Sequence, residues 1–307
     1  MKNYISYLLI LFILLSASTQ VLAGCDMCSL YLGMHPNQTK NSIGLRYRWS
    51  EYSGVNGHSH HVSHTNTNSY TQRRVFQTAE LWGQWMPSHR IQILFVVPYS
   101  MNSVENERNH QVIDVYNNLG DAQAIVRYLV YRSSDENKYQ QQFNAGIGIK
   151  TPTGQYKEFS RENYLDPHIQ NGTGSWDVLL TSSYLLKSDR LGFNQEINYK
   201  INTENNLKFK FANRFSSAST VFYSFKKSSI SFIPQVTFLI EHAGYDIDQG
   251  LSMYVTNGTA IYGQMGCDLY IQKFGINCGI AKPMMEELRD KSATNSLRLN
   301  FGLSYLL

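Results

Sequence analysis

Residues 296–307, SLRLNFGLSYLL, end the chain with a regular alternation of side chains. Apolar or aromatic residues occupy the odd positions from Leu297 to Leu307, and small or polar residues occupy the even positions except Leu306. Alternation with a period of two is typical of a β-strand that has one apolar face. Because chain ends usually fray, the pattern predicts that this strand pairs with another strand along its length.

The same alternation recurs through most of the chain, so the fold is predicted to be all-β. Few prolines and many tyrosine, phenylalanine, isoleucine and threonine residues also favour strands. Twelve segments share the pattern between about Asn41 and Leu307. They are 42–50, 74–85, 91–99, 121–131, 142–150, 175–186, 191–201, 207–215, 231–241, 265–271, 274–281 and 296–307.

The connections between these segments alternate between long and short. The long ones are about 52–72, 102–118, 152–171, 202–207, 244–257 and 284–295, and the short ones read PSHR, SSDENK, KSDR, KKSS and QK. Short turns at one end and longer loops at the other are typical of bacterial transmembrane barrels. The sequence therefore predicts a 12-stranded antiparallel up-and-down β-barrel with short periplasmic turns and longer extracellular loops, in which the last strand pairs with the first.

Charged residues lie on the face of the strands opposite the apolar one. A soluble β-sandwich would have to expose this face to water, whereas a barrel encloses it as the wall of its lumen, so we favour the barrel. The predicted lumen residues are Arg46, Arg48, Glu80, Asp121, Arg127, Lys150, Asp177, Glu196, Lys200, Lys208, Lys210, Arg214, Glu241, Asp268 and Arg298. This excess of positive charge predicts a slight preference for anions. Either a narrow pore or a salt-bridged, plugged interior fits twelve strands.

The first residues have the composition of an export signal. Lys2 precedes the apolar run YLLILFILLS, which is too short for a typical spanning helix. We predict a signal peptide over 1–24, a periplasmic segment over 25–40 and the barrel over 41–307. The expected location is the bacterial outer membrane, with membrane lipid and the barrel-assembly machinery as partners. A formal charge of +4 gives no reason to expect nucleic-acid binding.

The segment around Cys25 allows several interpretations. Leu22–Cys25, LAGC, matches the site at which bacterial lipoproteins are acylated, but VLA also suits ordinary signal peptidase. If Cys25 is not acylated, Cys25 and Cys28 form a C-x-x-C with Met27 and His35 nearby. Sulfur and imidazole ligands suit a soft metal ion, and a disulfide is the alternative in an oxidising compartment. No other cofactor is expected.

Cys267 and Cys278 flank a predicted hairpin that turns at Gln272-Lys273. Pairing 271 with 274 places the two cysteines opposite each other on the apolar face. Opposed Cβ atoms lie about 4.5–5.5 Å apart, which allows a disulfide. The alternative is that both residues pack as small apolar side chains.

The first long loop contains His58, His60, His61 and His64. Such a loop could collect a transition metal, or it could be an ordinary polar loop. His61 and Ser63 have the spacing of the pair used by outer-membrane phospholipases, but they lie in a loop and no asparagine is placed to orient the histidine. We therefore do not expect an enzyme.

Three stretches, NLGDAQAIVRY, GIGIKTPTGQY and HIQNGTGSWDVLL, resemble the outer-membrane transporters associated with the meta-pathway of phenol degradation. The cysteine-containing N-terminus resembles one subgroup of that family. The matching residues are Leu119, Gly120, Asp121, Lys150, Pro152, Thr153, Gly154, Gln170, Gly172, Gly174, Ser175 and Asp177. The resemblance implies an outer-membrane barrel that carries small molecules.

Two functions remain open from the sequence. The first is a porin-like channel for passive passage of a small solute, for which aromatic and hydrophobic molecules are candidates. The alternative is a barrel that transports nothing and binds a metal or a partner through its N-terminal cysteines or its histidine-rich loop.

Overall fold

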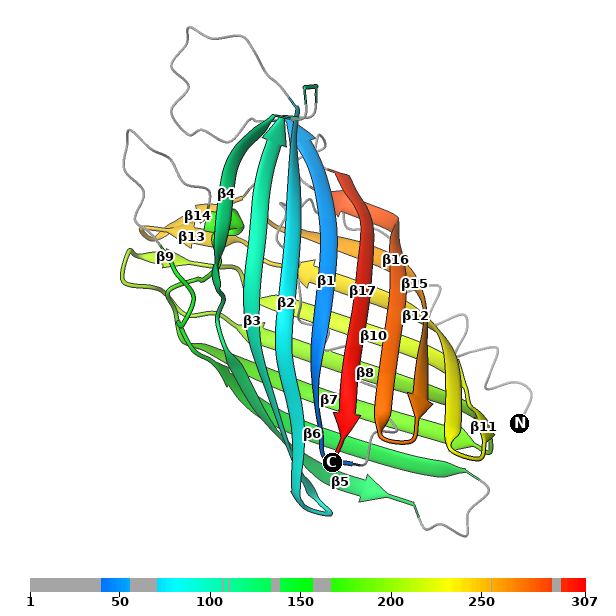
Figure 1. Cartoon of the computed structure of the whole chain (residues 1–307). Helices are drawn as coiled ribbons and strands as arrows, with labels where there is room; N and C mark the ends of the chain where they lie inside the picture. Colours follow the sequence, from blue (N-terminus) through cyan, green and yellow to red (C-terminus); the bar gives the residue numbers. More distant parts are fainter. Residues whose placement is uncertain are drawn as a thin grey trace, which may run out of the picture.

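The computed structural model describes residues 40–55, 71–106, 108–109, 111–133, 139–156, 167–254, 256–288 and 294–307. These residues form one closed antiparallel barrel with twelve strand positions (Figure 1). Two positions contain an interrupted strand, because β4 and β5 both pair with β3, and β10 and β11 both pair with β12. No helix in the described part of the chain is long and apolar enough to cross a membrane.

The strands of the barrel have the following bounds. They are β1 (Ser42–Val55), β2 (Thr71–Ser88), β3 (Ile91–Asn106), β4 (Val112–Leu119), β5 (Gln123–Arg132), β6 (Gln140–Lys150), β7 (Asp177–Ser188), β8 (Leu191–Ile201), β10 (Arg214–Tyr223), β11 (Phe225–Lys227), β12 (Ile230–Ala243), β15 (Gly258–Ile271), β16 (Phe274–Leu288) and β17 (Thr294–Leu306).

The last strand closes the barrel against the first. β17 pairs with β1 from Ser42 opposite Leu306 to Ser53 opposite Thr294. The amide of Leu307 donates to the carbonyl of Asn41 at 2.9 Å. The final strand is therefore hydrogen-bonded on both sides, which explains why its alternation continues to Leu307.

Most strands turn the majority of their apolar residues outward and their charged residues inward. On β1, Leu45 is 61% exposed, whereas its neighbour Arg46 is 7% exposed. Aromatic side chains gather on the outer wall toward the short-turn end, as in the aromatic girdles of membrane barrels. They include Trp85, Tyr128, Tyr223, Phe225, Phe232, Phe274 and Tyr305.

The two ends of the barrel differ as the sequence predicts. Two-residue turns after β2, β7, β11 and β15 lie at one end, and the longer connections lie at the other. Asp189, Ser228 and Gln272 have positive φ angles in these turns, as tight hairpin turns require. The connection predicted at 102–118 is instead mostly strand, because β3 continues to Asn106 and β4 begins at Val112.

The predicted eighth strand, 207–215, is wrong in position. The barrel strand at this place is β10, and β9 (Phe209–Lys210) belongs to a separate three-stranded sheet with β13 (Asp246–Asp248) and β14 (Leu251–Met253). Figure 1 shows this sheet at the long-loop end of the barrel. Lys208 precedes β9 and Lys210 lies on it, so neither lysine belongs to the barrel strands. Phe209, between them, packs against Phe211 instead of facing lipid. The positive excess predicted for the lumen is correspondingly smaller.

Candidate functional site

The candidate site is the charged lumen, and its central feature is the carboxylate of Glu80. Glu80 lies directly opposite Arg46 on the paired strand β1, and Arg48 follows two residues later on the same inward face. Arg46 Nε lies 2.7 Å from Glu80 Oε2, and Arg48 Nη2 contacts Oε1. Glu80 is only 2% exposed. One carboxylate therefore holds two guanidinium groups in place in the lumen.

A second ion pair crosses the interior between strands that are not neighbours. Arg127 on β5 approaches Glu196 on β8, with Nη2 and Oε1 3.1 Å apart. Arg127 also donates to Thr181 Oγ1 on β7 at 3.1 Å. The curvature of the barrel makes this contact possible, since β6 and β7 separate the two strands in the sheet.

A third ion pair joins Arg298 on β17 to Glu241 on β12 at 2.8 Å. The guanidinium of Arg298 also donates to the hydroxyls of Tyr52 and Tyr262, at 3.1 and 2.6 Å. It lies 3.9 Å from the centre of the Tyr262 ring, a favourable cation–π arrangement. Arg298 is thus fixed by four separate contacts.

Lys150 is the centre of a fourth charged cluster, which we call the latch and define as Lys150, Asp121, Asp177 and Thr173. The Lys150 ammonium lies 2.6 Å from Asp121 and 2.8 Å from Asp177. It also contacts Thr173 Oγ1. Asp121 accepts from the amides of Gly154 and Thr173 at 2.9 and 3.0 Å.

The latch brings together the three stretches in which the sequence resembles the transporter family. Asp121, Lys150 and Asp177 come from one stretch each. The backbones of Gly154 and Gly172 are in direct contact. A Cβ atom on Gly172 would clash with the Gly154 backbone, because it would lie 2.4 Å from the Gly154 carbonyl carbon. This close approach explains why glycine occupies both positions in this chain.

The latch holds the segment 167–176 across the long-loop end of the lumen, and we call this segment the cap. Its short 3-10 helix, η1 (Pro167–Ile169), places Ile169 in a buried apolar cluster with Tyr52, Phe76 and Val104. Asn102 on β3 donates to the Ile169 carbonyl at 2.9 Å. The cap is therefore packed into the mouth of the barrel.

His168 connects the cap to the small sheet. Its Nε2 lies 2.8 Å from Asp246 Oδ2, and the Ala212 amide donates to Asp246 Oδ1 at 2.7 Å. Burial alone would raise the pKa of the Asp246 carboxyl, but His168, the Ala212 amide and Arg214 together hold that pKa below its ordinary value.

We expect acid to weaken this contact. Because the pKa of Asp246 is lowered in the folded protein, its stabilising contribution is complete above the ordinary value of 3.8 and is lost as the pH falls through the lower folded-state value. Asp246→Asn should therefore loosen the cap at neutral pH, at a cost of about 1–3 kcal/mol. Urea unfolding at pH 7 and pH 3 measures this: the two proteins should differ more at pH 7, and an equal difference at both values contradicts the assignment.

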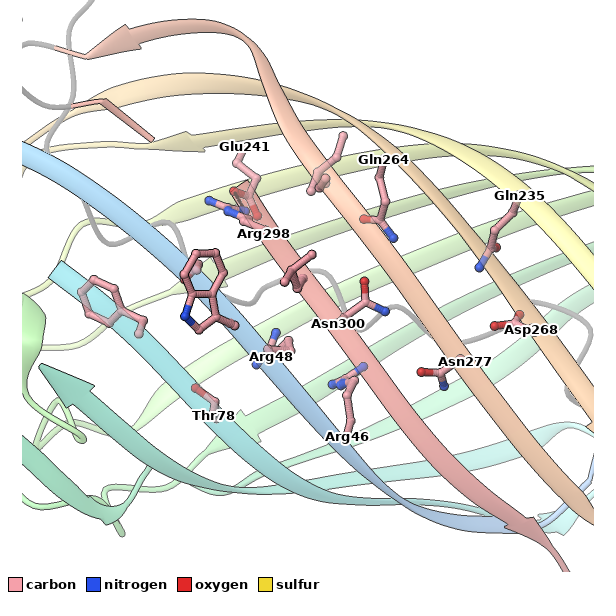
Figure 2. A pocket seen from close by; sticks show the side chains of 16 residues that line it. Arg46, Arg48, Thr78, Gln235, Glu241, Gln264, Asp268, Asn277, Arg298 and Asn300 are labelled. Carbon is pink, nitrogen blue, oxygen red and sulfur yellow. Dashed lines mark hydrogen bonds and ion pairs between the residues drawn. The ribbon is translucent and has the colours of Figure 1, made fainter. Parts of the chain in front are cut away.

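The lumen is not completely filled by these clusters. One cavity of about 110 Å³ is lined by Arg46, Arg48 and Arg298, together with the carboxamides Gln235, Gln264, Asn277 and Asn300 (Figure 2). A second cavity of about 130 Å³ extends toward the cap. Both are lined by Arg48, Phe76 and Thr78, so the two spaces are neighbours beside the Glu80 cluster.

The second cavity is lined mainly by charged and polar side chains. Four cations and two carboxylates border it, namely Arg48, Lys150, Lys200, Arg214, Glu80 and Asp121. Lys200 on β8 lies directly opposite Arg214 on β10. This pairing places two cations side by side at this level of the lumen.

Apolar side chains also point into the lumen, which the sequence analysis did not anticipate. Trp82, Leu94, Val96, Ile125 and Leu179 form one buried cluster on the inward face of β2, β3, β5 and β7. A second cluster consists of Leu185, Phe222 and Ile233, with Tyr270 packed against it. The sequence does contain a sign of these clusters, because some apolar residues share a strand face with charged ones. Ile125, for example, lies two residues before Arg127.

The predicted lumen residues other than Lys208 and Lys210 thus all lie on the barrel strands or, for Asp121, between β4 and β5. Cys25, Met27, Cys28, His35 and the loop histidines lie outside the described residues. Within the described residues, no group of three or more histidine, cysteine, aspartate or glutamate side chains is arranged to hold a metal ion.

Comparison with known proteins shows the fold. No family model and no curated protein matches the sequence. The structure resembles an outer membrane channel from Pseudomonas putida F1, with a TM-score of 0.62 and 12% identity over 89% of this chain and 100% of that chain. The translocator domain of the autotransporter NalP from Neisseria meningitidis has a TM-score of 0.45 and 8% identity, over 90% and 91% of the two chains. The protein has the fold of an outer-membrane β-barrel.

Proposed function

We propose that the protein is a channel of the bacterial outer membrane that lets small solutes pass through the barrel lumen. The observation that carries this proposal is the pair of internal cavities that share Arg48, Phe76 and Thr78. The ion-paired interior therefore leaves space between its side chains. The outer apolar wall and its aromatic side chains support the membrane location.

The solute class that suits this lumen is a small anion with an apolar or aromatic part. Inward-facing cations at Lys200 and Arg214 would attract the negative group. The cluster of Trp82, Leu94 and Ile125 would contact the apolar part. The resemblance to transporters associated with phenol degradation motivates the aromatic part of this proposal, and the similarity in fold to an outer membrane channel supports passage through the barrel.

Planar bilayer recordings test the channel. The purified protein should give small, discrete conductance steps, and its reversal potential in a KCl gradient should indicate a preference for chloride. Absence of conductance, together with absence of liposome swelling by small solutes, would contradict the proposal.

Lys200→Gln should shift the selectivity toward cations. A single charge about 4 Å from a permeating ion contributes about 1 kcal/mol even in water, which is about fivefold in relative permeability. Arg190→Gln is the matched control, because Arg190 lies in the turn between β7 and β8 and is largely exposed. Equal shifts for both variants would show that the lumen position has no special effect.

A further inference from the structure

Cys267 and Cys278 lie directly opposite each other on β15 and β16. Their Sγ atoms are 3.3 Å apart, and both thiols are free in the structure. A disulfide bond is about 2.0 Å long and tolerates a range of Cα separations that includes directly opposed strand residues. A small rotation of the two side chains would therefore bring the sulfurs to bonding distance.

The surroundings of this pair decide when it could react. The pair faces outward on the apolar wall, next to Met265 and opposite Pro234 and Phe301 on the flanking strands. Thiol–disulfide exchange requires a thiolate, and a charge is costly within hydrocarbon. Reaction is thus favoured before the hairpin enters the membrane.

The hairpin can bring the cysteines together without the rest of the barrel. Its two-residue turn is Gln272-Lys273, and Gln272 has the positive φ that such turns use. The ten residues between the cysteines form a short loop, whose closure has a small entropic cost. The pairing is local, and it needs no long-range contact to form.

We propose that Cys267 and Cys278 form a cross-strand disulfide, made outside the cytoplasm before the barrel is inserted. One thiolate attacks the disulfide of an exported protein oxidant and forms a mixed disulfide, and the second thiolate displaces that oxidant's sulfur. The cysteines together lose two protons and two electrons, and the oxidant's disulfide becomes a dithiol. The inference relies on the export included in the proposed function, but not on conduction.

The bond would fix the register of β15 on β16. A slip by one residue would turn the apolar face of a strand inward and its polar face toward lipid. A covalent link between 267 and 278 excludes that slip while the barrel assembles. Because both cysteines face the outer wall, the disulfide would leave the side chains of the lumen unchanged.

Peptide mapping tests the disulfide directly. Trypsin cleaves after Lys273 but not between Lys282 and Pro283, so the two cysteines lie in the separate peptides 228–273 and 274–289. In full-length protein taken from outer membranes with free thiols blocked by iodoacetamide, we expect these peptides to be joined and to separate on reduction. Recovery of both peptides singly, each carrying the alkyl group, would overturn the proposal.

Two variants distinguish a specific bond from chance oxidation. Cys25→Ser with Cys28→Ser removes the other cysteines of the chain, and the link should persist. Cys267→Ser with Met265→Cys moves one thiol to the position opposite Ile280, and the link to Cys278 should be lost. If the Met265→Cys, Cys267→Ser protein were cross-linked to Cys278 as completely as the wild type, the bond would not depend on the register of β15 on β16, and the proposal would be wrong. Conductance of the wild type with and without reductant separates a failure here from a failure of the channel proposal.

Discussion

Glu80→Gln is expected to make the channel markedly more anion-selective and the barrel less stable. The substitution removes the one carboxylate that lies between Arg46 and Arg48, and all three side chains face the lumen. Arg46 and Arg48 both line the first cavity, and Arg48 also lines the second, so two guanidinium groups without this carboxylate would border the open space of the lumen. Removing one partner from a buried ion pair costs about 3–5 kcal/mol, because the remaining charge loses its compensation.

Reversal potentials and urea unfolding midpoints measure the two effects of Glu80→Gln. Glu204→Gln is the control, since Glu204 is exposed and its carboxylate pairs with the exposed Lys208 at 3.1 Å. An exposed pair of this kind contributes about 0–1 kcal/mol. If both variants kept wild-type selectivity, Glu80 would not border the path of the ions.

The strand pattern predicted most of this barrel because its signal is local. The two-residue turn at Gln272-Lys273 was enough to place Cys267 opposite Cys278, and the structure confirms that register. The same reasoning placed Glu80 and Arg46 on inward faces. It could not identify the partner of Arg127, because Glu196 is reached across the lumen and depends on the curvature of the whole barrel.

The error at the eighth strand shows where alternation misleads. Phe209 and Phe211 alternate with lysines, but they pack against each other, and Phe211 also packs against His168 of the cap, instead of facing lipid. The true strand β10 has Ser217 and Ser219 on its outer face, so its apolar signal is weak. Gln195 on β8 compensates, because it donates to Ser217 at 2.9 Å and accepts from Ser219 at 2.5 Å. A cross-strand hydrogen bond can thus replace an apolar side chain, which no single-strand pattern reveals.

Lys150→Met is expected to loosen the cap and increase the conductance. Asp177 is fully buried and Asp121 nearly so, and both would lose their ammonium partner. The cost of leaving them uncompensated is about 3–5 kcal/mol. Because Lys150 also contacts Thr173 and the Ser175 carbonyl, the cap would lose two of its contacts with the strand end and keep the hydrogen bonds of Thr173 to Asp121.

The same recordings and urea titrations measure the effect, with Lys226→Met on the exposed strand β11 as the control. Adding Asp177→Asn to Lys150→Met removes one of the two carboxylates that have lost their ammonium partner, so it should restore part of the stability. It should not restore the contacts of Lys150 with Thr173 and Ser175. The double variant should therefore remain more conductive than the wild type while unfolding at a higher urea concentration than Lys150→Met alone. Lower stability with unchanged conductance would mean that the latch stabilises the barrel but that the cap does not narrow the path. The narrowest part of the path would then be expected at the Glu80 cluster.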